Sequence, residues 1–449
     1  MLNMTRGRPA VRILRFSVPL LAGNVLQQAY YLVDSIVVGN FVGTEALAAV
    51  GSTFILNFLL VSLFSGLAMG FTIIIAQLLG ASDQDAIQRA VHTAYVTALV
   101  GALAVTVAGL ALVHPLLGLL NTPAGLTREL SGLYLGILFA GTLFNFGYNL
   151  NTGVLQGLGD SVSSLVFLAL ATVVNIALDL LFVLVFRWGV AGVAWATVIA
   201  QAVSFIAGLV FITRRRGIRL SSLVTTGFDT RILGRAARIG LSGGVQMMLF
   251  SVGQIALQRL INSYGPVFMA AWAAVNKIDS VAFMPVASFS SAAMSYAGQN
   301  TGAGQLDRVR SGLRATLVMS IAVCAVASTL VLAFGPSLLA LFSPEPTVVH
   351  DGMQVLWRLM PCYVLLAVLF PFNAVMRGTG ASLMPFIAAF TSFMIVRLPA
   401  AYLLNHWAGP ENIGWCFGIG WVAGIAVIVS WYLRGTWTRR VVPSVTTAG

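Results

Sequence analysis

The chain has 449 residues, of which 58% are hydrophobic and only 8% charged. Soluble domains typically carry about 25% charged residues, so this composition excludes an ordinary water-soluble domain and predicts that much of the apolar surface faces lipid. A net charge of +12 would suggest a nucleic-acid partner in a soluble protein. Here most of the arginines fall on one side of the apolar runs, which is the positive-inside pattern. The pattern predicts both termini in the cytoplasm, an even number of spans and no nucleic-acid partner.

A membrane span needs roughly 20 apolar residues. The first apolar run has no small-residue cleavage site after it, so we interpret it as a retained span and not as a signal sequence. Runs of this length recur along the chain with short loops between them, at residues 13–38, 46–79, 90–114, 130–152, 162–185, 190–212, 237–262, 270–299, 312–338, 352–375, 382–405 and 412–433. The sequence therefore predicts an all-α membrane protein with 12 transmembrane helices.

The two halves of the chain resemble each other at an offset of about 222 residues. Gln77–Ala81 matches Gln299–Ala303, and Gln156–Ser161 matches Arg377–Ser382. With six spans in each half, the repeat is parallel and predicts two six-helix bundles related by pseudo-two-fold symmetry. The sequence predicts an N-terminal bundle at residues 1–212, a basic cytoplasmic connector at 213–236, a C-terminal bundle at 237–434 and a cytoplasmic tail at 435–449.

Two carboxylates lie inside spans of the N-terminal half. Asp34 is late in the first span, and Asp179 is in the fifth, four residues after Asn175 and therefore on the same helix face. Charged groups within a membrane are costly and usually functional. This pair can hold a proton, or a dehydrated sodium ion whose shell is completed by neutral oxygens. The alternative is that each carboxylate is interfacial or hydrogen-bonded for packing.

The C-terminal half does not repeat this pattern. Its spans contain Arg259, Lys277, Asp279 and Arg397, and the sequence leaves their roles open. Arg397 falls roughly where Asn175 falls in the first half, so it is either a cation lining a cavity or a structural anchor. In the first span, Pro19 is either a flex point or a first-turn helix proline.

Several of these sequence motifs resemble those of the multidrug and toxic compound extrusion (MATE) family. The matches are the first-span pattern with Asp34, the run at residues 43–50, the two Gln-x-x-Gly-Ala elements and the turn at residues 156–160. The resemblance covers nearly the whole chain. It implies an N-terminal ion-coupling site formed by Asp34, Asn175, Asp179 and Thr197, with Tyr30, Tyr134 and Asn149 lining the same lobe.

Some sodium-coupled members of that family also use acids in spans 7 and 10, which are absent here. This departure favours the DinF-type branch, coupled through the N-terminal lobe. The resemblance implies a secondary active multidrug exporter of the bacterial inner membrane, an antiporter that exchanges protons or sodium ions for amphipathic, often cationic, organic compounds. The default oligomeric state is a monomer surrounded by lipid.

The alternative function is that of a lipid-linked oligosaccharide flippase of the same superfamily, although flippases tend to line their cavities with several cations. An enzyme is not expected, because His92, His114, His350 and His406 are scattered near span ends. The sequence has no Walker A motif and no metal-ligand cluster, so no cofactor and no catalytic residue are predicted. The cysteines lack paired spacing and predict lipid-facing or packed thiols.

Overall fold

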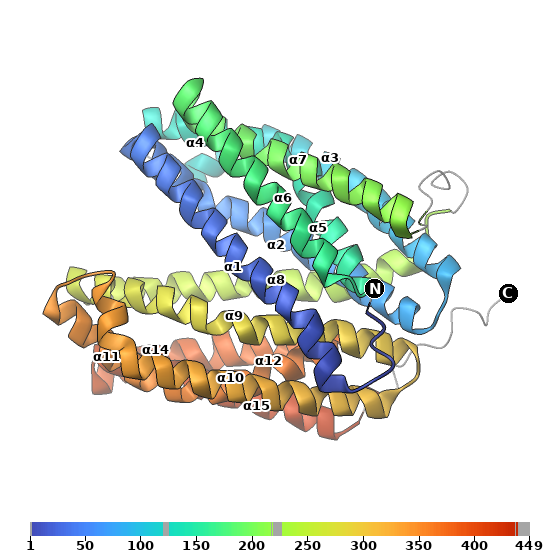
Figure 1. Ribbon diagram of the computed structural model, residues 1–449. Helices are drawn as coiled ribbons and strands as arrows, with labels where there is room; N and C mark the ends of the chain where they lie inside the picture. Colours follow the sequence, from blue (N-terminus) through green and yellow to red (C-terminus); the bar gives the residue numbers. More distant parts are fainter. Residues whose placement is uncertain (1, 120–124, 217, 219–226, 436, 439–449) are drawn as a thin grey trace. The chain divides into compact units, whose positions relative to one another are not determined.

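The computed structural model describes residues 2–119, 125–216, 218, 227–435 and 437–438, so parts of the connector and of the C-terminal tail lie outside the described residues. Within these ranges the chain consists of helices joined by short turns, without β-strands (Figure 1). The prediction of an all-α protein is confirmed.

Long helices follow one another through both halves of the chain. The first half contains α1 (Pro9–Val37), η1 (Val38–Val42), α2 (Thr44–Gly80), α3 (Gln84–Leu119), α4 (Leu126–Ala140), α5 (Thr142–Gly157), α6 (Ser161–Leu180), η2 (Leu181–Val185) and α7 (Gly189–Arg216). The second half contains α8 (Thr230–Asn262), α9 (Pro266–Gly302), α10 (Leu306–Ala340), α11 (Pro346–Leu359), η4 (Met360–Cys362), α12 (Tyr363–Gly378), α13 (Leu383–Phe390), η5 (Thr391–Arg397), α14 (Leu398–Ala408), η6 (Pro410–Gly414) and α15 (Trp415–Leu433). The elements η1, η2 and η5 are π-helical turns that continue the helices before them.

The number of spans follows from the length and apolarity of these helices. Ten described helical segments are long and apolar enough to cross a membrane, and α4 with α5, bent by 53° at Gly141, forms an eleventh. The remaining long helix is α2, whose described apolar part is Phe64–Gly80. Together they give the predicted set of twelve, with the fourth span bent where the sequence predicted a single run.

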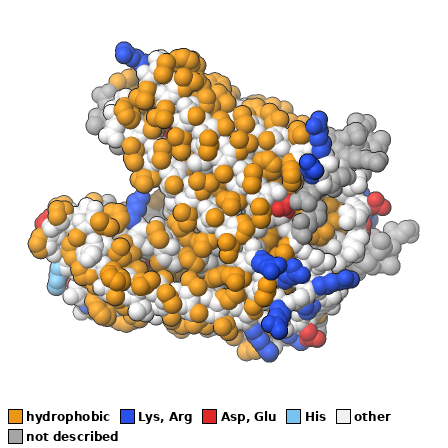
Figure 2. All heavy atoms as spheres, in the orientation of Figure 1, with side chains coloured by type: hydrophobic (Ala, Val, Ile, Leu, Met, Phe, Trp, Pro, Cys, Tyr) orange, Lys and Arg blue, Asp and Glu red, His pale blue; other side chains and the backbone are white. Residues whose placement is uncertain are grey.

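Apolar side chains cover the outside of these helices. Large hydrophobic residues such as Val318, Val173 and Leu103 are 69%, 66% and 64% exposed, and hydrophobic side chains spread over most of the face seen in Figure 2. Since a contiguous apolar surface of this extent is unstable in water, it fits contact with lipid. All three cysteines, Cys324, Cys362 and Cys416, are buried free thiols.

Two compact units make up the chain. Unit 1 consists of Pro19–Gly244 with the first two residues, and unit 2 consists of Asn3–Val18 with Val245–Gly449. The division passes through two helices: the first turns of α1 belong to unit 2, and the first turns of α8 belong to unit 1. The domain boundaries expected from the sequence stay a prediction. The compact units differ from them in the first turns of α1 and of α8, each of which belongs to the unit formed mainly by the other half.

In unit 1, small residues bring α2 and α8 into close contact. A Cβ added at Gly70 would lie 2.1 Å from the carbonyl oxygen of Ala236, and one added at Gly240 would lie 2.6 Å from that of Gly66. Each helix thus presents two small residues four positions apart, the spacing that allows membrane helices to approach backbone to backbone. This contact fixes the start of α8 within unit 1.

The two Gln-x-x-Gly-Ala elements have related structural roles. In unit 1, Gln77 accepts a hydrogen bond from Arg235 of α8 at 3.2 Å. In unit 2, Gln299 accepts one from the backbone nitrogen of Met4 at 2.9 Å, and Arg308 donates to the Met4 carbonyl oxygen at 3.1 Å. In both units the motif therefore holds the segment that enters from the other half of the sequence.

Candidate functional site

The predicted ion-coupling residues all lie in unit 1, on three helices. Asp34 is on α1, Asn175 and Asp179 are on α6, and Thr197 is on α7. Each carboxylate lies just before a π-helical turn, η1 after Asp34 and η2 after Asp179. A π-turn leaves backbone groups less regularly paired and is frequent at functional sites. The spacing of Asn175 and Asp179 does place both of them in the buried face of α6.

The turn before α6 sets the position of this helix. Gly159 has a φ of +76°, a conformation that glycine adopts without strain. The Asp160 carboxylate then caps α6 by accepting from the Ser163 backbone nitrogen at 3.0 Å. Further along, the hydroxyl of Ser204 on α7 donates to the carbonyl oxygen of Phe167 at 2.8 Å. These contacts fix the register between α6 and α7, and hence between Asn175 and Thr197.

Thr197 connects the polar side chains of the three helices. The Asn175 amide donates to the Thr197 hydroxyl at 3.5 Å, and the Tyr30 hydroxyl lies 3.4 Å from the same oxygen. Asp34 and Asp179 are close enough to interact electrostatically. The structure thus brings together Tyr30, Asp34, Asn175, Asp179 and Thr197.

Four buried acceptor oxygens in this cluster have no hydrogen-bond partner: Oδ1 of Asp34, Oδ1 of Asn175 and both carboxylate oxygens of Asp179. The amide nitrogen of Asn175 donates to Thr197, which leaves its oxygen without a partner. Unpaired buried oxygens are costly, and a bound proton or dehydrated cation would satisfy acceptors of this kind. Among the described residues there is no group of three or more His, Cys, Asp or Glu side chains, so this donor set combines two carboxylates with neutral oxygens.

Apolar packing encloses the cluster. Tyr134 of α4 is buried with Val37 and Val38 from the end of the first span, with Val183 of η2 and with Val198 of α7. In the sequence, Val37 comes three residues after Asp34, Val183 four residues after Asp179, and Val198 directly after Thr197. Tyr134 therefore packs beside the segments that carry the two carboxylates, and its role as a lining residue stays a prediction.

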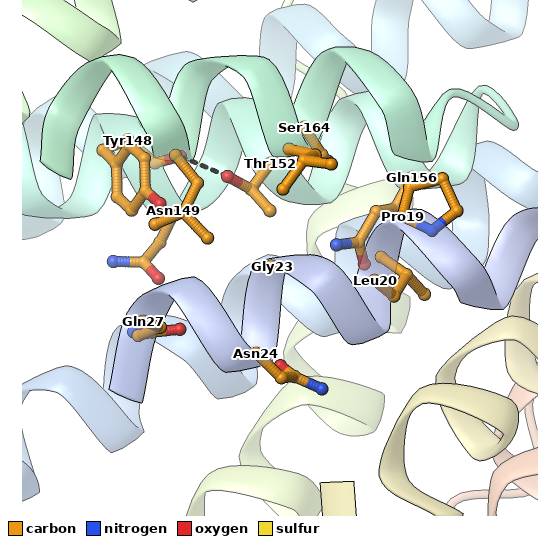
Figure 3. A pocket seen from close by; sticks show the side chains of 12 residues that line it. Pro19, Leu20, Gly23, Asn24, Gln27, Tyr148, Asn149, Thr152, Gln156 and Ser164 are labelled. Atoms are coloured by element: carbon orange, nitrogen blue, oxygen red, sulfur yellow. Dashed lines mark hydrogen bonds between the residues drawn. The ribbon is translucent and has the colours of Figure 1, made fainter. Parts of the chain in front are cut away.

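A second polar region in unit 1 forms a cavity of about 130 Å³ between α1, α5 and α6. Asn149 lines this cavity and does not contact the carboxylates; its side chain lies opposite Gln27 of α1 (Figure 3). Thr152 donates to the carbonyl oxygen of Tyr148 at 3.1 Å, the bond drawn in Figure 3. The walls carry amides and hydroxyls without a charged group, a surface suited to neutral polar groups of a bound molecule.

The sequence prediction did not include most residues of this cavity. Gln27, Tyr148, Thr152, Gln156 and Ser164 line it together with Asn149. The sequence could have indicated these residues, because Asn149, Thr152 and Gln156 recur at helical spacing along one face of α5. A search restricted to charged intramembrane residues overlooks such a face.

The charged residues of the second half lie in unit 2. Arg259 and Lys277 are exposed, whereas Arg397 is only 3% exposed at the end of η5. Asp279 of α9 accepts a hydrogen bond from the Tyr363 hydroxyl. Arg397, expected with less support as a cavity-lining residue, is therefore in a different unit from the carboxylate cluster.

Comparison with known proteins identifies the family. The model of the family described as MatE matches residues 19–181 and 244–403, one stretch in each half of the chain. The chain belongs to the MATE family. The two matched stretches also agree with the internal repeat, and they identify the protein as a transporter with the two-bundle arrangement of this family.

Bacterial relatives and solved structures extend over nearly the whole chain. A probable multidrug resistance protein of Bacillus subtilis, YpnP, is 33% identical over 438 residues, 97% of each chain. A probable multidrug resistance protein NorM of Thermotoga maritima is 22% identical, covering 97% of this chain and 95% of that one. The crystal structure of MATE in complex with MaL6 matches with a TM-score of 0.90 at 22% identity, over 98% and 99% of the two chains. This match confirms the twelve-helix fold.

Proposed function

We propose that this MATE protein is a secondary active multidrug exporter of the bacterial inner membrane, with both termini in the cytoplasm and a monomer as the working unit. It exchanges protons or sodium ions for amphipathic, often cationic, organic compounds. The relatives named as multidrug resistance proteins support the substrate class. The arginine-rich segments on one side of the spans support the orientation.

The observation that carries the ion coupling is the group of buried oxygens without partners on Asp34, Asn175 and Asp179. A bound proton or sodium ion satisfies these oxygens and neutralises charge within a low-dielectric region. Loss of the ion leaves two carboxylates in electrostatic repulsion, which favours a different packing of α1 against α6. The ion then selects between two arrangements of unit 1, as an antiporter requires. These properties also fit the branch coupled through the N-terminal lobe.

Transport of ethidium by bacteria lacking their own efflux pumps tests this proposal. Asp34→Asn and Asp179→Asn keep side-chain size and remove the charge, and both are expected to reduce efflux to the level of cells without the protein. Asp160→Asn is the matched control, because asparagine caps a helix as well as aspartate does and this residue lies outside the cluster; we expect it to retain efflux. A protonophore and the omission of sodium distinguish the two ions.

Retention of wild-type efflux by both cluster variants, at matched membrane levels, would contradict the ion site. Failure of a well-expressed wild-type protein to export ethidium or any other organic cation would contradict the substrate class. In that case transport of a lipid-linked oligosaccharide becomes the function to test.

A further inference from the structure

Unit 2 contains a buried arginine, Arg397, that makes no salt bridge with the described residues, although the Asp279 carboxylate is near enough to interact with it electrostatically. Arg397 closes the π-helical turn η5, and its side chain is 3% exposed. The backbone there is tightly held by α15, since a Cβ added at Gly420 would lie 2.9 Å from the Cβ of Arg397. No acidic side chain of the described residues forms an ion pair with it. A charged group in this position is costly, so its surroundings indicate what it does.

Aromatic rings cover the guanidinium group. Its central carbon lies 3.4 Å from the ring centroid of Phe417 and 4.3 Å from that of Phe393. These cation–π contacts offset part of the cost of burial. They also hold the planar group in one orientation, with its hydrogen-bond donors directed along its edges.

One edge of this group is poorly satisfied. Nε of Arg397 is buried and has no hydrogen-bond partner. Nη2 makes only a long contact of 3.5 Å to Oε1 of Gln254. The sulfur of Cys416 lies beside the guanidinium and is a weak acceptor. Nε and Nη2 form the edge that binds a carboxylate through two parallel hydrogen bonds.

The nearest acid does not take this role. The Asp279 carboxylate accepts a hydrogen bond from the Tyr363 hydroxyl and does not form a salt bridge with Arg397. Gln254 and Phe393 are both partly exposed. Both side chains contact the guanidinium, so their rotation is the movement by which a ligand would reach the unsatisfied edge.

We propose that Arg397 is a specificity-determining residue of unit 2 that binds the carboxylate of a transported amphiphile. The inference rests on the proposed export function and refines its substrate class to include zwitterions that carry a carboxylate. Unit 2 then recognises an anionic group with a built-in cation, while the carboxylates of unit 1 bind the coupling ion.

Tetramethylrhodamine, a zwitterion with a free carboxylate, and its methyl ester, a cation, form a matched pair of probes. Both are measured for efflux from proteoliposomes containing the full-length protein, under the ion gradient that drives ethidium export, with protein-free liposomes as the baseline. Arg397→Gln is expected to reduce export of the zwitterion about ten- to a hundredfold relative to export of the ester. Arg397→Lys restores part of the difference, since it keeps the charge and loses the paired donors.

Arg358→Gln is the control, because this arginine of unit 2 already donates to Asn412 at 2.8 Å and to Gln354 at 2.8 Å. It is expected to leave the ratio of the two export rates unchanged. An equal loss of both dyes in Arg397→Gln, or no loss of either, overturns the assignment. Wild-type export of ethidium and of the ester, with an unchanged ratio in the variant, rejects this inference and leaves the proposed function intact.

Binding to the wild-type protein in detergent provides a measurement that does not depend on a folded variant. Fluorescence anisotropy should show tighter binding of tetramethylrhodamine than of its ester, and benzoate should compete with the former only. Equal affinities for the two dyes, or competition by chloride as effective as by benzoate, would contradict recognition of a substrate carboxylate.

Discussion

The fifth span of each half follows a similar turn in the sequence, but the polar side chains of the two spans differ: acceptor oxygens in the first half and a guanidinium group in the second. In unit 1, Asn175 and Asp179 precede the π-turn η2 and present acceptor oxygens without partners. In unit 2, Arg397 ends the π-turn η5 at the position that the repeat matches to Asn175, and it presents donors. Unit 1 is therefore suited to take up a cation, whereas unit 2 already contains one. The repeat has kept a π-turn in this span, placed after the matched residue in unit 1 and before it in unit 2, and has changed the charge.

The largest expected effect comes from giving unit 1 the residue of unit 2. Asn175→Arg places a permanent guanidinium beside Asp34 and Asp179, where it occupies the position of the coupling ion. We expect ethidium export to fall to background while the protein still folds, because the new positive charge pairs with the buried carboxylates and offsets the charge of one of them. Sodium-dependent thermal stabilisation in detergent should disappear as well, if sodium is the coupling ion of the wild-type protein.

Asn175→Gln is the control for this replacement, since it keeps the amide and adds one methylene group. Its export should exceed that of Asn175→Arg at equal membrane levels. Export by Asn175→Arg at the wild-type rate would show that Asn175 and the carboxylates do not form the ion site, and the comparison between the two units would then fail.

A smaller effect is expected where the two units share a packing device. Gly70→Ala in unit 1 directs a Cβ to within 2.1 Å of the Ala236 carbonyl oxygen, and Gly378→Ala in unit 2 directs one to within 2.3 Å of the Met294 carbonyl oxygen. Overpacking of this kind costs about 1–3 kcal/mol. Both variants should lower the unfolding temperature measured by scanning fluorimetry.

Gly136→Ala serves as the control, because no atom lies within 4 Å of the Cβ that it adds. If only one of the two tight glycines proves sensitive, the units differ in packing as well as in charge. If both variants lower the unfolding temperature equally, the two units differ in their polar side chains and not in this packing.

Hydropathy and spacing were sufficient to predict the helices and the carboxylates. Each expected span coincides with a long helix or a bent pair, because a lipid-facing helix needs an unbroken apolar run. Asp34 and Asp179 could be identified as candidate site residues from the sequence because charged residues are rare in such runs. Thr197 was indicated only by the resemblance, since hydroxyls are common in apolar spans and nothing local distinguishes this one.

Features that depend on packing between distant helices were not predictable in the same way. The bend at Gly141, the close contact of α2 with α8 and the division of α1 between the units all depend on residues far apart in sequence. The contact of Arg397 with Phe417 likewise joins different helices, whereas Phe393 lies on the same turn as Arg397. A single sequence shows the polar residues of a span but not which neighbours satisfy them.

The smallest expected effect concerns the tyrosine of each polar cluster. Tyr363 donates to Asp279 in unit 2, while Tyr30 lies 3.4 Å from the Thr197 hydroxyl in unit 1, near the limit of a hydrogen bond. Hydrogen bonds between membrane helices contribute about 0.6 kcal/mol on average. Tyr363→Phe should therefore lower thermal stability slightly, because the bond it removes is made to a carboxylate, and Tyr30→Phe should lower it less. The reverse order in scanning fluorimetry would show that the polar cluster of unit 1 is more firmly held than that of unit 2, which is incompatible with a site that releases its ion in each transport cycle.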